Sequence, residues 1–458
     1  MKRKIYDKLL NWKNRQADRY ALLVEGARRT GKSYIVEEFA KAEYAHHLIL
    51  DFSIVGSEIK ELFNEKLGDL NEFFMLLESR TGVALSPRNS LIVFDEVQRF
   101  PRAREAIKTL VKDGRFHYIE TGSLISIKKN VENILIPSEE LKVRLYPMDF
   151  EEFLWALGRE GLANLIRRRF ERREQMGQTD HRRAMEYFRQ YMVVGGMPQS
   201  VAAFAETRNL GTVEEAKQAI LGLYADDIGK FAGRYRNKVR AIWNAIPGAL
   251  SGHSGRFQPG YAGRNVRSRE LVAPFEWLKD SMTVNLCRNA TDPNSGFCMT
   301  EDESAPKCYM GDTGLLASHA FADNETSALD ISRRIITGSI ELNKGMLVEN
   351  VVAQMLTAAG QRLFYHTERN TPELGGCMEI DFLLTRALIG RRKNVYPMEV
   401  KSGTRYTTSS LDKFMRKYPQ YVAQPLVLHP SDFKSDDKKL YFPLYMASLL
   451  PEIDIIPA

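Results

Sequence analysis

The sequence has little cysteine and no long apolar run. Its 458 residues include four cysteines, Cys287, Cys298, Cys308 and Cys377, and no C-x-x-C pair. This spacing argues against a zinc site and fits a reducing compartment. No apolar stretch approaches the roughly 20 residues that span a bilayer. The basic N-terminus lacks the apolar centre of a secretory signal, so we expect a soluble, cytoplasmic protein with no membrane partner.

Charge of neither sign dominates. Hydrophobic residues make up 44% of the chain and charged residues 27%, with a net charge of +7. This excess permits a nucleic-acid partner but equally describes a generally basic surface. The chain is too long for one core, so we expect three domains, at residues 1–155, 156–335 and 336–458.

The first 155 residues alternate short apolar runs with helical patterns, which predicts a parallel α/β sheet. The middle region is predicted to be helical and then irregular. It includes a basic patch of Arg256, Arg264, Arg267 and Arg269. From residue 336 a long helix is followed by strands and a further helix, which predicts a second α/β domain. The strand-like runs of the first domain are Ala21–Val24, His47–Phe52, Ser90–Phe94, His117–Glu120 and Leu141–Tyr146.

A phosphate-binding loop follows the first of these runs. The motif G-x-x-x-x-G-K-[ST] spans Gly26, Ala27, Arg28, Arg29, Thr30, Gly31, Lys32 and Ser33. Glycines let successive backbone N–H groups face an anion, and the helix that follows presents its positive end to the same anion. Lys32 is predicted to reach the β- and γ-phosphates, and Ser33 to ligate magnesium. The motif therefore predicts binding of ATP with Mg²⁺.

Two carboxylates follow a buried strand downstream of this loop. Asp95 and Glu96 come directly after Leu91-Ile92-Val93-Phe94, at the carboxyl edge where open parallel sheets bind ligands. We expect Asp95 to hold the magnesium ion and Glu96 to act as general base on the attacking water. At the end of the next strand, Thr121 or Ser123 either senses the γ-phosphate or orients the water, or both belong to an ordinary strand-end turn.

A second set of carboxylates lies in the last third of the chain. Glu349 falls on a predicted helix, Asp381 within a strand, and Glu399 and Lys401 two apart on another strand, where they share a face. Glu…Asp…Glu-x-Lys is the pattern of metal-dependent phosphodiester cleavage, in which carboxylates bind one or two magnesium ions. The alternative is a set of charge pairs at strand ends.

With both motifs in view, the chain resembles the prokaryotic ATPases that have an N-terminal AAA-14 domain and a C-terminal domain of unknown function, DUF4143. Further segments carry the resemblance over nearly the full length. They are Phe94–Gln98, Glu120–Ser123, Pro147–Leu154, Tyr191–Val201 with Gly195-Gly196-Met197-Pro198, Tyr309–Leu316 with Asp312-Thr313-Gly314, Lys344–Val352, Glu379–Leu384 and Pro397–Gly403.

The resemblance implies an AAA+-related P-loop core, a winged-helix-like connecting region and a C-terminal fold like restriction endonucleases. It places the nucleotide site at Gly31, Lys32, Ser33, Asp95 and Glu96. It places a nuclease-like site at Glu349, Asp381, Glu399 and Lys401.

Two hypotheses for the whole protein follow from these sites. In the first, ATP hydrolysis drives a DNA-associated machine whose C-terminal domain binds or cuts nucleic acid. In the second, the protein is a nucleotide-dependent switch that binds a protein partner, and the nuclease-like domain is inert. A pure nucleotide binder without turnover is a third hypothesis. A homo-oligomer, in which a neighbouring subunit offers an arginine to the γ-phosphate, is left open.

Overall fold

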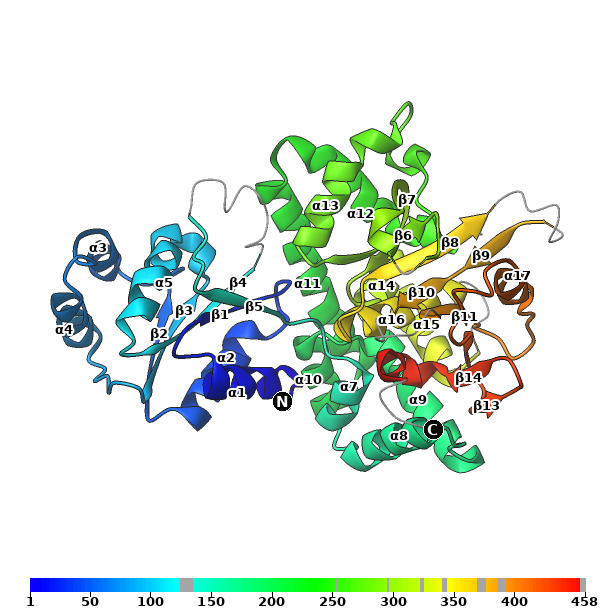
Figure 1. Ribbon diagram of the computed structural model, residues 1–458, viewed down its shortest axis with the longest axis horizontal. Coiled ribbons are helices and arrows are strands. Elements are labelled where there is room, and N and C mark those ends of the chain that lie inside the picture. The colour runs from blue at the N-terminus through cyan, green and yellow to red at the C-terminus, as the bar shows by residue number, and fades with distance from the viewer. Residues whose placement is uncertain are drawn as a thin grey trace. The chain divides into compact units, whose positions relative to one another are not determined.

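The computed structural model describes residues 1–123, 135–252, 254–294, 296–321, 325–339, 344–368, 376–385 and 393–453 (Figure 1). The chain divides into two compact units. The first is Met1–Tyr146 with Asp280–Met282, and the second is Pro147–Lys279 with Thr283–Ala458. The chain therefore separates after Tyr146, and the division of the remainder at residues 155 and 335 stays a prediction. Each unit is described by itself.

The first unit is a parallel five-stranded sheet with helices packed on it. Its strands lie in the order β2-β3-β4-β1-β5, and every described pair is parallel. The predicted α/β fold is therefore confirmed. The strands are β1 (Ala21–Glu25), β2 (His46–Asp51), β3 (Ser90–Asp95), β4 (His117–Gly122) and β5 (Glu140–Arg144), and the helices are α1 (Ile5–Arg15), α2 (Lys32–Glu43), α3 (Ser57–Glu65), α4 (Leu70–Thr81) and α5 (Pro101–Asp113).

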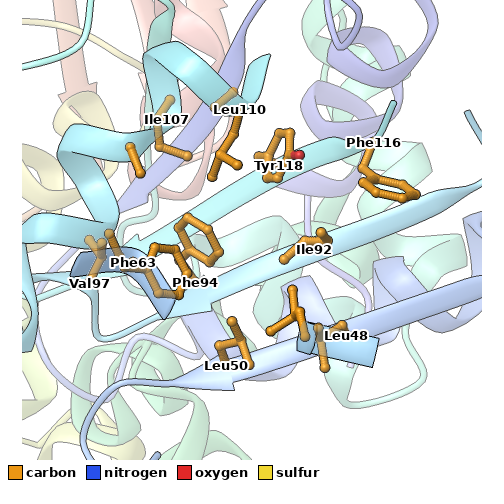
Figure 2. Close-up of a cluster of buried hydrophobic side chains, with 14 of the residues drawn as sticks. Leu48, Leu50, Phe63, Ile92, Phe94, Val97, Ile107, Leu110, Phe116 and Tyr118 are labelled. Carbon is orange, nitrogen blue, oxygen red and sulfur yellow. The ribbon is translucent and has the colours of Figure 1, made fainter. Parts of the chain in front are cut away.

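Both faces of this sheet are covered by apolar packing. Successive residues of β3 point to opposite faces, because side chains alternate along a strand. Ile92 and Phe94 pack with α3, α4 and α5 in the cluster of Figure 2. Leu91 and Val93 pack on the other face against α1 and α2. Because both faces of β3 are buried, its sequence is a continuous apolar run. The same packing holds in place the end of the strand that carries Asp95.

Helices dominate the first part of the second unit, as the sequence predicts for the middle region. The first of them, α7, begins with a capping box, in which Asp149 accepts from the backbone of Glu152 and Glu152 from that of Asp149. The helices of this unit are α7 (Phe150–Ala156), α8 (Glu160–Arg172), α9 (Gln178–Val194), α10 (Pro198–Thr207), α11 (Leu210–Phe231), α12 (Arg236–Ser251), α13 (Val272–Asp280), α14 (Thr313–Ala320), α15 (Glu325–Thr337), α16 (Lys344–Ala358) and α17 (Ser409–Lys417).

Two mixed sheets complete the second unit. One has the order β7-β6-β8-β9 and the other β10-β11-β12-β14-β13. The β6–β7 hairpin belongs to the predicted middle region, yet β6 pairs with β8 of the C-terminal region. The winged helix expected there stays a prediction. The strands are β6 (Val284–Ala290), β7 (Glu301–Met310), β8 (Leu363–Glu368), β9 (Met378–Ile380), β10 (Phe382–Thr385), β11 (Val395–Val400), β12 (Leu426–His429), β13 (Lys434–Ser435) and β14 (Leu440–Pro443).

Several motifs that carry the family resemblance meet in one buried network in the second unit. The backbone N–H of Gly196 donates to Asp312, which also caps α14 by accepting from Leu315. The side-chain amide of Gln354, on α16, donates to the same Asp312 carboxylate over 3.2 Å. Met148 N–H donates to the Gly196 carbonyl over 2.7 Å. These motifs therefore join helices and connecting segments of the second unit through hydrogen bonds.

No helix within the described ranges combines the length and apolar character that a membrane span requires.

Candidate nucleotide-binding site

The phosphate-binding loop joins the end of β1 to the start of α2. Gly31 has a φ of 89°, in the left-handed region, and α2 begins at Lys32 without an acidic residue in its first turn. A Cβ added to Gly26 would lie 2.4 Å from the carbonyl oxygen of Leu145. Both glycines are therefore required by the backbone. The loop leads into a helix N-terminus that favours an anion.

Lys32 extends back over this loop. Its Nζ donates to the carbonyls of Gly26 at 3.0 Å and Ala27 at 2.9 Å and to Oγ of Ser123 at 2.9 Å. Burial lowers the pKa of Lys32 to about 8, although the Glu96 and Asp95 carboxylates act in the opposite direction. No carboxylate within the described ranges forms an ion pair with this buried ammonium. A phosphate would supply the missing opposite charge.

Two hydroxyl groups converge on Asp95 at the carboxyl edge of the sheet. Ser33 Oγ, in the first turn of α2, donates to Oδ1 of Asp95 over 2.9 Å. Thr121, on β4, donates to the same oxygen. Carboxylate and hydroxyl oxygens are the protein ligands that Mg²⁺ takes beside phosphates. The residues present therefore fit a magnesium ion held by Ser33 and Asp95.

The backbone of Glu96, next to Asp95, has an unusual conformation. Its φ is 53°, in the left-handed region that non-glycine residues seldom adopt. Its backbone N–H lies 3.5 Å from Oγ1 of Thr121, and its carboxylate accepts from Nε2 of Gln98 over 2.5 Å. Strained backbone of this kind gathers at functional sites. Gln98 ends the Phe94–Gln98 segment of the family resemblance, but the sequence predicted no role for it in the site.

The rest of the loop is braced by contacts that the sequence does not reveal. Oγ1 of Thr30 is buried and donates to the Ala27 carbonyl over 2.9 Å. Arg3 precedes α1 and donates to the carbonyls of Thr30 at 3.0 Å and Tyr146 at 2.7 Å. Arg28 is half-buried, whereas Arg29 is exposed and has a φ of 66°.

The C-terminal carboxylates come from separate elements of the second unit. Glu349 lies on α16, and Asp381 stands between β9 and β10. The antiparallel register that pairs Phe382 with Met398 brings Asp381 beside the end of β11, where its carboxylate accepts from Val400 N–H over 2.8 Å. Glu399, also at this end, accepts from Leu411 N–H over 2.8 Å. Nζ of Lys401 lies 2.8 Å from Oε2 of Glu399.

Another lysine, Lys307 on β7, lies among these carboxylates. Its Nζ is 2.9 Å from Glu349, 3.1 Å from Glu379 and 3.8 Å from Asp381. Across the described ranges, no three His, Cys, Asp or Glu side chains are grouped so as to hold a metal ion. With the Lys307 ammonium between them, Glu349 and Asp381 do not fit a metal ion as they lie. The metal-ligand assignment of Glu349, Asp381, Glu399 and Lys401 stays a prediction.

Comparison with known families bears on three parts of the chain. Residues 18–154 match the model of the AAA domain AAA-14, and residues 344–447 match the domain of unknown function DUF4143. The resemblance inferred from the sequence is therefore confirmed for both ends. Residues 185–326 match another domain of unknown function, DUF8612, which the sequence analysis did not anticipate. No curated protein matches the chain.

Solved structures that resemble this chain share little sequence with it. A Walker-type ATPase of Pyrococcus abyssi is 14% identical with a TM-score of 0.40, covering 69% of this chain and 95% of its own. Cdc6p from Pyrobaculum aerophilum is 13% identical with a TM-score of 0.25, covering 73% and 92%. Orc1 of Aeropyrum pernix, solved in complex with DNA, is 11% identical with a TM-score of 0.28, covering 72% and 95%.

The family match agrees with the topology of the first unit. A parallel sheet carries the phosphate-binding loop after β1 and the acidic pair after β3, with β4 between these two strands. The first unit therefore has the AAA-type P-loop ATPase fold.

Proposed function

We propose that the first unit binds ATP with magnesium and hydrolyses it. The observation that carries this proposal is the convergence of Ser33 and Thr121 on Oδ1 of Asp95 beside the phosphate-binding loop. This arrangement joins the loop, the acidic strand β3 and the neighbouring strand β4 at one oxygen. Nucleotide hydrolysis needs the phosphate site, the metal ligands and the base to meet in this way.

Each loop and strand-end residue has a distinct role in this proposal. Backbone N–H groups from Arg28, Arg29, Thr30 and Gly31 face the phosphates, together with the first turn of α2. Lys32 contacts the β- and γ-phosphates, for which it must leave the carbonyls of Gly26 and Ala27. Its positive charge then offsets the negative charge of the transferred group.

The strand-end residues act on the attacking water and the metal. Ser33 and Asp95 hold the magnesium ion, which neutralises charge on the phosphate oxygens when bound. Glu96 accepts a proton from the attacking water as general base. Thr121 keeps the Asp95 carboxylate in place and lies close to the backbone of Glu96. Gln98 restrains the Glu96 carboxylate until substrate arrives.

Substitution of Glu96 tests this proposal. Glu96→Gln is expected to preserve ATP binding and to reduce hydrolysis about 100-fold or more, because a positioned base contributes about 10² to 10⁴ in rate. Lys32→Ala is expected to lose binding. Glu58→Gln, the same change at an exposed carboxylate on α3, is the matched control. If the unaltered protein hydrolyses ATP no faster than Glu96→Gln, the protein is a nucleotide binder without turnover.

For the second unit we propose that the nuclease-like domain serves as an interaction module whose state follows the nucleotide. Lys307 favours this proposal over metal-dependent cleavage, because its ammonium lies between carboxylates that would otherwise hold the metal. The partner is a protein or a nucleic acid. The competing proposal assigns Glu349, Asp381 and Glu399 to magnesium, and Lys401 to the attacking water.

Cleavage and binding assays separate these two proposals. Magnesium-dependent cleavage of DNA or RNA that Asp381→Ala or Lys401→Ala abolishes would establish the nuclease and exclude the inert module. Nucleic-acid binding without cleavage, weakening steeply with salt, would identify binding to phosphates. Replacement of the exposed Arg264, Arg267 and Arg269 by alanine is then expected to reduce the salt slope by about one for each phosphate that an arginine had bound.

A further inference from the structure

Lys307 is a buried cation surrounded by three carboxylates from two other parts of the chain. It stands on β7 with 1% of its residue surface exposed. The carboxylates are Glu349 from α16, Glu379 from β9 and Asp381 between β9 and β10, at 2.9, 3.1 and 3.8 Å from Nζ. Carboxylates from two separate segments of the chain thus converge on the ammonium group of a third.

Neighbouring groups complete this cluster on its other sides. Nη2 of Arg256 lies 3.3 Å from Glu379, and the hydroxyl of Tyr309 donates to Glu349. Lys307 also lies over the ring of Tyr365, with Nζ 5.5 Å from its centroid. Neither the Arg256 guanidinium nor the Tyr365 ring carries a negative charge. The three carboxylates therefore balance the charge of Lys307.

The electrostatic environment of Lys307 favours its charged form. Burial alone would lower the pKa of Lys307, but the carboxylates of Glu349, Asp381 and Glu379 outweigh burial and raise it well above its usual range. A buried charge without partners is costly, whereas one with several close opposite charges is tolerated. Removal of Lys307 would leave its carboxylates facing one another across a small space.

The same space has the ligand chemistry of a divalent-cation site. Magnesium and manganese take carboxylate oxygens, and magnesium holds its oxygen ligands at about 2.0–2.1 Å. The point that the Lys307 ammonium occupies is already within 4 Å of three carboxylates. An ammonium and a divalent ion cannot occupy this point together.

We propose that Lys307 is the resident cation of this carboxylate cluster, and that it and a divalent metal ion compete for the same oxygens of Glu349, Glu379 and Asp381. The cluster is therefore complete without metal in the resting protein. Replacing Lys307 by a neutral side chain converts it into a divalent-cation site. This inference deepens the proposal that the second unit is an inert module, but it concerns metal binding and is tested apart from cleavage or ATP turnover.

Manganese binding by the full chain tests the competition. All proteins carry Asp95→Asn, so that the nucleotide site contributes no manganese binding, and free Mn²⁺ is measured by electron paramagnetic resonance without nucleotide. Lys307→Met is expected to bind one Mn²⁺ at least about 10-fold more tightly than the Lys307 parent. Adding Asp381→Asn to Lys307→Met is expected to remove this gain. Mn²⁺ should also raise the unfolding midpoint of Lys307→Met, because binding stabilises the folded state.

Lys217 offers a matched control for the loss of a buried lysine. It is 1% exposed and pairs with Glu214 over 3.0 Å. Lys217→Met should therefore gain no Mn²⁺ binding. Lys307→Gln, which keeps a hydrogen-bonding side chain, replaces Lys307→Met if circular dichroism shows that the methionine variant does not fold.

Two results would overturn the proposal. One is a folded Lys307→Met or Lys307→Gln protein that binds Mn²⁺ no more tightly than the parent. The other is a gain in Mn²⁺ binding by Lys307→Met that the added Asp381→Asn does not remove, because the metal would then lie away from this carboxylate cluster. Cleavage assays on the same proteins report on the nuclease alone, so failure of either proposal is distinguishable from failure of the other.

Discussion

The hydroxyl of Ser33 donates a hydrogen bond to Oδ1 of Asp95 over 2.9 Å. Sixty-two residues of chain separate the two, and the contact joins the first turn of α2 to the end of β3. Since β4 lies between β1 and β3 in the sheet, the strand between them also contributes a hydroxyl, that of Thr121. The metal-binding oxygen of the proposed site is thus positioned by hydrogen bonds before nucleotide arrives.

Removal of the Thr121 hydroxyl is expected to slow hydrolysis more than it weakens binding. Thr121→Val keeps the shape of the side chain but leaves Oδ1 of Asp95 with one donor fewer. We expect kcat for ATP to fall about 10- to 100-fold, because catalysis is sensitive to small errors in position. The Kd for ATP should change less than about threefold. Steady-state hydrolysis and equilibrium nucleotide binding measure the two effects.

Thr121→Ser is the control for this substitution, because serine retains the hydroxyl. It should hydrolyse ATP within a few-fold of the unaltered rate. A Thr121→Val protein with unchanged kcat would remove Thr121 from the proposed site.

Arg3 lies outside the phosphate-binding motif, yet its loss is expected to weaken nucleotide binding. Arg3 donates to the carbonyl of Thr30 within the loop and to that of Tyr146. Hydrogen bonds that involve a charged group contribute about 1.5–3 kcal/mol each. Arg3→Ala should raise the Kd for ATP about 10-fold, measured by calorimetry. Arg19→Ala, at an exposed arginine beyond α1, should leave it unchanged.

Gly196 is expected to tolerate no side chain. A Cβ at this position would lie 2.0 Å from the carbonyl oxygen of Met148, which is backbone and cannot rotate away. We expect Gly196→Ala to lower the free energy of unfolding by about 3 kcal/mol, the upper range for overpacking. Chemical denaturation monitored by circular dichroism measures this loss.

Gly222 provides the opposite expectation for the same substitution. It lies within α11, and nothing stands within 4 Å of an added Cβ. Gly222→Ala should stabilise the protein by about 0.5–1 kcal/mol, because alanine favours the helix. Equal effects at the two glycines would contradict the steric account.

The sequence predicts the first unit well because its signals are local. The loop from Gly26 to Ser33 and the acidic pair after β3 are short motifs with fixed spacing, and the apolar runs fall within a residue or two of the strands. The contact of Ser33 with Asp95 follows from the parallel sheet, since carboxyl ends of strands meet at one edge. Arg3 carries no pattern that distinguishes it from surface residues, and Gln98 lies in a segment that carries the family resemblance but was assigned no role there.

The carboxylate cluster of the second unit is harder to predict, because the residue at its centre, Lys307, comes from another part of the chain. Glu349, Asp381 and Glu399 can be selected as carboxylates at element ends. Lys307 lies 42 residues before Glu349 and reaches it because α16 packs against β7. One signal exists in the sequence, since Lys307 interrupts the otherwise apolar end of β7, where a buried lysine needs partners.

The stability of the protein should depend on pH through His429. Its Nδ1 contacts the hydroxyl of Tyr406 at 2.8 Å and its Nε2 the carbonyl of Asp432 at 3.2 Å, an arrangement that suits the neutral ring. Burial, with a contribution from Lys434, lowers the pKa of His429 from 6.5 to about 4. The unfolded chain therefore binds one more proton between these values. The contribution to stability is full above pH 6.5 and is lost as the pH falls toward 4.

The expected loss between pH 6.5 and 5 is about 2 kcal/mol, at about 1.4 kcal/mol per pH unit. Urea denaturation at several pH values measures it. Over the same pH range the free energy of unfolding of His429→Gln, whose side chain does not titrate, should fall by about 2 kcal/mol less. Identical slopes for the two proteins would mean that His429 is not neutral when folded.

The β6–β7 hairpin determines where the C-terminal part of the chain can be cut from the rest. A polypeptide that began at residue 336 would lack both strands, so β8 would lose its hydrogen-bonded neighbour β6 and expose an open edge to other chains. The same cut would remove Lys307 and leave Glu349, Glu379 and Asp381 repelling one another. The C-terminal fold is therefore expected to stay intact apart from the rest of the chain only when the β6–β7 hairpin, from residue 284 onward, is retained with it.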